Sequence, residues 1–165
     1  MNFLILKKLF LYGIYAISNK LNNVELFLLN KGDLLKFNLV IKFSLLFNNT
    51  VLLDLIVYES NYNNKLIFIY SYKLLNNNIY LLTCTAKKYI NSIEFFFKNA
   101  SWLEREVSDF FNIFFKNKKD RRTLFSIPLI YSAPLKKSFP TNGFYEIFLC
   151  FFLKKLKFKH VSSKN

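Results

Sequence analysis

Side chains able to bind or react are concentrated in two parts of this sequence. Residues 101–111 contain the single Trp, one of the three Arg and three of the ten acidic residues: Trp102, Glu104, Arg105, Glu106 and Asp109. Residues 120–124 and 134–146 hold the other two Arg and two of the three Pro, among them Asp120, Arg121, Arg122, Pro134, Leu135, Lys137, Phe139 and Pro140. Elsewhere the chain favours residues with A/T-rich codons, such as Phe, Asn and Lys. We infer that the disfavoured types persist here because a physical role holds them.

The carboxylates of the first part would suit general acid–base catalysis if two of them shared a cleft. Glu104 and Glu106 are two positions apart, however, and on a helix their side chains point to different sides. A solvated face with weak ion pairs is the simplest alternative. Trp and Arg are enriched at interface hot spots, which favours a docking helix. Arg121 and Arg122 lack the Gly-rich turn or helix start of a phosphate site, so we expect them in buried or interfacial ion pairs.

The scarcity of His and Cys excludes several classes of site. One His and two Cys cannot form an all-Cys/His zinc site, an iron–sulfur cluster or a disulfide framework. There is no second imidazole for a histidine relay. We expect Cys84 and Cys150 to be small core residues and His160 to be solvated.

The composition indicates a folded chain of unusual charge. Of 165 residues, 53% are hydrophobic and 19% aromatic, which excludes disorder. The net charge is +14, which would normally suggest nucleic acid. Most of the basic residues are Lys, whereas Arg is the residue that reads bases and phosphates in a bidentate way. We therefore attribute much of the charge to an AT-rich genome, for which an organelle is a good candidate.

The elements that position these residues can be inferred from hydrophobic periodicity. We expect helices over 3–20 and 33–47, strands over 24–29, 51–59, 65–73 and 79–86, and a helix after Ser92 with a stripe of Leu103, Val107, Phe110, Phe111 and Phe114. A loop over 116–140, a strand over 144–152 and a Lys-rich tail follow. The expected fold is a single α+β domain with a mostly antiparallel sheet of about four strands and helices packed on it. Its parts are an N-terminal apolar segment (1–22), a core (23–115) and a C-terminal loop region (116–165).

These motifs resemble the family of the thirty-kilodalton (NuoC-type) subunit of respiratory complex I. That family has a Trp-x-Glu-Arg-Glu-x-x-Asp segment, matched by Trp102, Glu104, Arg105, Glu106 and Asp109. Its Asp-Leu-Arg-Arg-x-Leu loop is matched by Asp120, Arg121, Arg122 and Leu124. Its last motifs are matched by Pro134, Leu135, Lys137, Phe139, Pro140, Gly143, Tyr145 and Glu146. The resemblance covers about residues 23–146.

The sequence departs from the family pattern at several positions. Asn112 stands where a Gly is usual, and Asn tolerates the left-handed conformation better than most residues. Lys118 and Lys119 replace a His-Pro pair, and Ser138 replaces an Asp. The acidic stretch that often follows the last motif is replaced by residues 148–159.

The resemblance implies a non-catalytic structural subunit that supports electron transfer from NADH to ubiquinone. It would lie in the peripheral, matrix-side arm of complex I at the mitochondrial inner membrane, beside the forty-nine-kilodalton and iron–sulfur subunits. The thirteen residues of the opening paragraph would form the subunit interface. We expect no flavin, cluster, nucleotide or metal on this chain, no nucleic-acid partner, and only indirect membrane contact.

Two other classes of function stay open at this point. An organellar ribosomal protein would fit the small size and the charge, with the tail Lys154–Lys159 on rRNA. A peripheral membrane protein would use the same basic and aromatic tail. The apolar run near the N-terminus is broken by Lys7 and Lys8 and is too short to span a bilayer.

Overall fold

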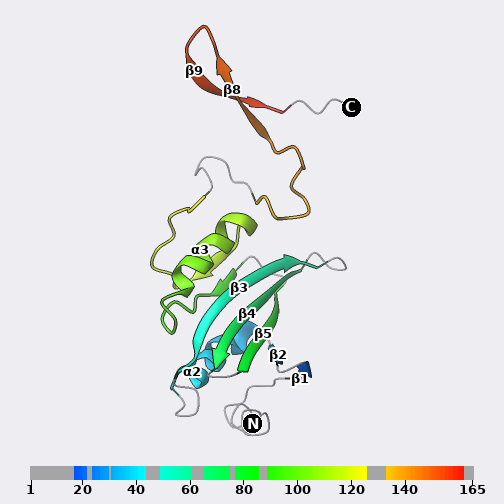
Figure 1. Cartoon of the computed structure of the whole chain (residues 1–165), viewed down its shortest axis with the longest axis vertical. Coiled ribbons are helices and arrows are strands. Elements are labelled where there is room, and N and C mark those ends of the chain that lie inside the picture. The colour runs from blue at the N-terminus through cyan, green and yellow to red at the C-terminus, as the bar shows by residue number, and fades with distance from the viewer. Residues whose placement is uncertain are drawn as a thin grey trace.

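A five-stranded sheet forms the centre of the molecule (Figure 1). The computed structural model describes residues 17–21, 24–29, 31–43, 49–60, 65–74, 77–85, 89–125 and 133–161. The strands are β1 (Ile17–Leu21), β2 (Val24–Leu29), β3 (Val51–Glu59), β4 (Leu66–Leu74) and β5 (Asn77–Thr85). Their order is β1-β2-β5-β4-β3, and the predicted antiparallel meander β3-β4-β5 is confirmed. The sheet has one strand more than expected, and β2 runs parallel to β5.

The predicted helix over 3–20 is wrong for the part that the structure describes. Residues 17–21 form β1, which pairs antiparallel with β2 from Ile17 opposite Leu28 to Leu21 opposite Val24. Pairing with β2 satisfies the backbone groups on one side of this edge strand, so tertiary context overrides the apolar helical pattern. Residues 1–16 lie outside the described part.

Helix α2 (Leu34–Phe43) follows a short 3-10 turn, η1 (Lys31–Asp33). Asp33, predicted to begin the helix, lies in this turn, and its carboxylate is 3.7 Å from Nζ of Lys36. Leu34, Phe37, Val40 and Ile41 of this helix are buried, and the predicted end at residue 47 lies outside the described residues. Asn38 is also buried: its amide donates to the Leu34 carbonyl, and its Oδ1 accepts a bond from the hydroxyl of Tyr72 (2.6 Å). This bond ties α2 to β4.

Alternation along β4 defines the core. Phe68, Tyr70 and Tyr72 are fully buried, whereas on the other face Ile67 and Ile69 are half-buried and Ser71 is buried. The ring of Tyr72 lies 6.4 Å from that of Phe37 on α2 and 5.5 Å from that of Phe97, measured between centroids. Helix α2 and the turns that contain Phe97 therefore pack on the same face of the sheet.

Helix α3 (Ala100–Phe111) lies beside β3 and carries five of the thirteen predicted site residues (Figure 1). The short parallel strands β6 (Tyr89–Asn91) and β7 (Phe114–Lys116) flank it in the sequence. The predicted apolar stripe faces inward as far as Phe111. Its last member, Phe114, belongs to β7 and is half exposed. The helix ends because Asn112 adopts the left-handed conformation (φ 50°, ψ 55°).

The left-handed conformation of Asn112 leads to a testable prediction. A left-handed residue suits Gly, is tolerated by Asn and costs about 1 kcal/mol for a residue with a Cβ and no compensating side chain. Asn112→Ala should lower the free energy of unfolding by about that amount, and Asn112→Gly should leave it nearly unchanged. Urea unfolding of both variants measures this, and an equal loss in the two would contradict the capping role.

The C-terminal region differs from the expected strand and tail. Strand β8 (Tyr145–Cys150) falls within the predicted 144–152 strand, and part of the expected Lys-rich tail, Lys155–His160, forms a second strand, β9. The hairpin stands away from the central sheet in Figure 1, and its side chains are almost all exposed. Cys150 is accordingly half exposed rather than a core residue, while His160 is exposed as predicted. The side chain of Cys84, in β5, lies outside the described part. The α+β class is confirmed; the division at residues 22 and 115 stays a prediction.

Candidate interaction site on helix α3

The charged residues of α3 fall into two groups that the sequence did not separate. Trp102 is 62% exposed and Glu106 is exposed, whereas Glu104 has no exposed surface and Arg105 and Asp109 are buried. Glu104 and Glu106 thus point to different sides, as their spacing predicted. For Glu104, Arg105 and Asp109 the interpretation as a solvated helix face with weak ion pairs is therefore wrong.

Glu104 is the centre of a buried polar cluster that joins three segments. Its carboxylate accepts bonds from the Ser92 hydroxyl (2.7 Å), the Ile93 N–H (2.8 Å) and Nζ of Lys118 (3.1 Å). Lys118 also donates to the Ser101 carbonyl (2.8 Å). Burial raises the pKa of Glu104, while these donors and the charge of Lys118 oppose the rise. A buried charge needs such partners, so the cluster fixes α3 against the chain on either side.

Arg105 holds the loop that carries Asp120. Its guanidinium donates to the carbonyls of Arg122 (2.9 Å) and Thr123 (3.5 Å) and pairs with the Asp120 carboxylate (3.3 Å). Arg122 pairs with the same carboxylate at 2.8 Å. Hydrogen bonds from Arg122, and the charges of both arginines, hold the pKa of Asp120 well below its usual range. Arg122 thus forms an ion pair, but an exposed one with a residue two positions away and not the buried pair that was expected; an interfacial pair stays a prediction.

Asp109 fixes the same loop one turn further along the helix. Its Oδ2 accepts bonds from the backbone N–H groups of Leu124 (2.6 Å) and Phe125 (2.9 Å). The rings of Phe110 and Phe125 are stacked with centroids 5.5 Å apart. Arg105 and Asp109 together fix residues 120–125 along α3, which brings the first two sequence motifs into one site.

The outer surface of this site combines aromatic rings with arginines. The guanidinium of Arg105 lies over the ring of Trp102 (5.1 Å), and that of Arg121 lies over Phe114 (4.4 Å). A small cavity of about 200 Å³ lies between α3, β7 and the loop, lined in part by Arg105, Phe114 and Arg121. Exposed aromatic side chains beside arginines are typical of interface hot spots. We call Trp102, Phe114, Arg121 and Arg122 the α3 patch.

The third motif lies on a loop that is anchored to the core. The N–H of Leu135 donates to the Phe110 carbonyl at the end of α3 (3.2 Å), and that of Lys137 donates to Oε2 of Glu59 on β3 (2.9 Å). Pro134, Leu135, Lys137 and Pro140 are exposed, and Phe139 is half-buried. Sequence reasoning missed Glu59 and Lys118, since contacts between distant parts of the chain leave no local pattern.

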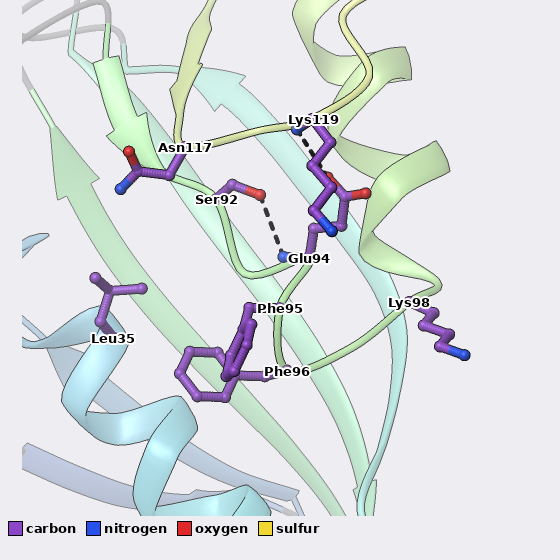
Figure 2. Close-up of a pocket in the computed structure, with 8 residues that line it drawn as sticks. All are labelled: Leu35, Ser92, Glu94, Phe95, Phe96, Lys98, Asn117 and Lys119. Atoms are coloured by element: carbon purple, nitrogen blue, oxygen red, sulfur yellow. Dashed lines mark hydrogen bonds between the residues drawn. The ribbon is translucent and has the colours of Figure 1, made fainter.

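A larger cavity of about 700 Å³ lies between α2 and the turns before α3 (Figure 2). Leu35, Phe95 and Phe96 give it apolar walls, and the Glu94 carboxylate on its rim accepts a bond from the Lys119 N–H (3.4 Å). The Ser92 hydroxyl in its lining donates to Glu104 and is not available as a nucleophile. This cavity suits an apolar side chain better than catalysis.

Two kinds of feature are absent from the described residues. No group of three or more His, Cys, Asp or Glu side chains there could hold a metal ion. No helix in the described ranges is long and apolar enough to cross a membrane.

Comparison with known proteins gives consistent results. A family model described as the 30 Kd subunit of respiratory-chain NADH dehydrogenase matches residues 20–145. The chain is 39% identical over 72 residues to NADH-ubiquinone oxidoreductase subunit 9 of Acanthamoeba castellanii, which is 44% of this chain and 36% of that protein. It is 35% identical over 104 residues to the protein of the same name from Paramecium primaurelia, covering 61% of this chain and 48% of that protein. In these matches the chain spans between about a third and a half of its relatives' length.

Two solved structures share the fold. A chain of an archaeal respiratory membrane complex, the membrane-bound sulfane sulfur reductase, superposes with a TM-score of 0.63 at 17% identity, covering 82% of this chain and 79% of that one. A trypsin-resistant fragment of Nqo5 superposes with a TM-score of 0.53 at 14% identity, covering 72% of this chain and 98% of the fragment. At these identities the likeness concerns the fold alone.

Proposed function

Because this chain belongs to the family of the 30 kDa subunit of respiratory-chain NADH dehydrogenase, we propose that it is a non-catalytic structural subunit of mitochondrial complex I. It would lie in the peripheral arm on the matrix side of the inner membrane. There it would support the quinone-reducing module during electron transfer from NADH to ubiquinone. The forty-nine-kilodalton subunit and the iron–sulfur subunits are the neighbours we propose.

The arrangement around α3 is the observation that carries this proposal. Buried Glu104, Arg105 and Asp109 make their contacts within the chain, and they fix a rigid surface instead of a cleft with free reactive groups. The α3 patch then presents exposed aromatic and Arg side chains. A pre-organised surface of this kind lowers the cost of docking another protein.

The thirteen predicted site residues accordingly divide into two roles. We propose direct contact with neighbouring subunits for nine of them: Trp102, Glu106, Arg121, Arg122, Pro134, Leu135, Lys137, Phe139 and Pro140. We propose a positioning role for Glu104, Arg105, Asp109 and Asp120. Glu104 has no exposed surface, so we propose that it supports the interface from within the chain.

Trp102 tests the direct contacts separately from folding. Trp102→Ala removes a side chain that is largely exposed in the isolated chain, so the free energy of unfolding should change by only about 0.5 kcal/mol. Loss of a central aromatic at an interface costs about 2 kcal/mol or more, or about thirtyfold in affinity. Native gels of the respiratory complexes should therefore show less assembled complex.

The matched control for Trp102 is Phe43→Ala, which removes a similarly exposed aromatic from α2. We expect normal assembly in that variant. Equal effects of the two substitutions would show that α3 has no special part in docking.

A further inference from the structure

The β8–β9 hairpin has two chemically different faces. Directly paired residues of an antiparallel ribbon lie on the same face. One face therefore consists of the pairs Tyr145/His160, Ile147/Phe158 and Leu149/Leu156. The opposite face consists of Glu146/Lys159, Phe148/Lys157 and Cys150/Lys155. We call them the apolar face and the lysine face.

Side-chain contacts agree with this register. The rings of Tyr145 and His160 lie 4.3 Å apart, and a carboxylate oxygen of Glu146 lies 3.9 Å from Nζ of Lys159. All six side chains of the apolar face are exposed. An isolated two-stranded hairpin is only marginally stable in water, so this face needs a cover.

The separation of the two faces indicates what the cover is. A flat membrane contact needs lysines beside the apolar side chains, so that they reach the lipid phosphates, whereas the three lysines of β9 (Lys155, Lys157 and Lys159) lie on the opposite face. One apolar and one charged face is instead the pattern of a sheet that packs on protein and turns its other face to water.

The size of the apolar face argues against a second copy of this chain as the cover. Six side chains are far fewer than the roughly 20–30 residues a side of a standard interface. A contact of this size gives stable binding only where another contact already holds the two proteins together. The hairpin follows the loop whose Leu135 N–H is bonded to the end of α3, so it is continuous with the proposed docking surface.

We propose that the apolar face of the hairpin packs on an apolar surface of a neighbouring subunit, while the lysine face stays in water. This inference rests on the proposed function and deepens it. The family match ends at residue 145, where the hairpin begins, so this contact belongs to a segment that the family model does not describe.

Adjacent residues of β8 provide a matched labelling experiment. Cys150 lies on the lysine face and Leu149 on the apolar face. The full chain, tagged and expressed in its host, is compared with Leu149→Cys in a Cys150→Ser background, both as isolated chain and within the assembled complex. A maleimide reagent labels the thiols, and mass spectrometry locates the label.

The expected result is protection of one position only. In the complex, labelling of Cys at 149 should slow by about tenfold or more, since the core of an interface is dry, while Cys150 keeps its rate. Equal rates for position 149 in the two states would overturn the inference, as would protection of Cys150 instead.

A second pair of variants covers the case in which the new cysteine disturbs the hairpin. Ile147→Ser with Phe158→Ser changes one cross-strand pair of the apolar face, and Phe148→Ser with Lys157→Ser changes the adjacent pair of the lysine face. On native gels only the first should release the subunit from the complex in raised detergent. If the second releases it equally, the inference fails while the proposed function stands. If the unaltered chain joins no NADH dehydrogenase complex, the proposed function fails too.

Discussion

Replacement of Lys118 by Met is expected to lower the free energy of unfolding by about 3–5 kcal/mol, a large share of the roughly 5–15 kcal/mol of a typical domain. The substitution keeps the volume of the side chain but leaves the Glu104 carboxylate buried without its counter-charge. The Ser92 hydroxyl and the Ile93 N–H still bond to it but carry no full charge. Urea unfolding followed by circular dichroism measures the loss.

Two further variants and the pH dependence identify the cause. Lys119→Met removes an exposed neighbouring lysine and should change stability by no more than about 0.5 kcal/mol. Adding Glu104→Gln to Lys118→Met should restore about 2 kcal/mol, because no buried charge is left and the amide oxygen can still accept the Ile93 N–H.

The sign of the pH dependence follows from the raised pKa of Glu104. Loss of Lys118 raises this pKa further, so the folded variant retains the proton where the unfolded chain has released it. The free energy of unfolding of Lys118→Met therefore falls as the pH rises above about 4.3, the pKa of a Glu in the unfolded chain. The loss of stability relative to the unaltered chain becomes smaller as the pH is lowered toward that pKa. A deficit independent of pH would contradict the buried-charge explanation.

Replacement of Arg105 by Ala is expected to deplete the assembled complex on native gels. The guanidinium holds the carbonyls of Arg122 and Thr123, and its loss frees the loop that carries Arg121 and Arg122. A docking surface that must be ordered at the moment of binding loses affinity, and a hot-spot loss of about 2 kcal/mol corresponds to about thirtyfold. Increased proteolysis of the isolated chain near residue 121 would show the loosened loop.

Lys73→Ala is the matched control, since it removes an exposed basic side chain from β4. Normal assembly and normal NADH:quinone activity of the Arg105→Ala variant would contradict the positioning role.

Local pattern was sufficient to predict much of the fold. Alternation predicted β3, β4 and β5 almost to their bounds, and the stripe of apolar residues predicted α3. The β1 segment was misassigned because its partner strand decides its conformation. The alternation of Lys155–His160 was present in the sequence, but a run of lysines suggested a solvated tail, and only its pairing with β8 makes it a strand.

The geometry of the site could not be predicted from the sequence, and the part of its residues in a subunit interface stays a prediction. The motifs around Arg105 and Asp120 do meet in space. Sequence could not indicate that Lys118, one member of a basic run, is buried beside Glu104, since the burial depends on how β7 and α3 pack. For the same reason the loop anchor between Glu59 and Lys137, 78 positions apart, left no signal in either segment.

The most direct test of the docking account is a pull-down of the tagged full chain from its host in mild detergent, followed by mass spectrometry. We predict recovery of other NADH dehydrogenase subunits, foremost the forty-nine-kilodalton and iron–sulfur subunits, and their loss in the Arg105→Ala variant. Recovery of ribosomal proteins, or of NADH dehydrogenase subunits in equal amounts from the variant, would contradict it.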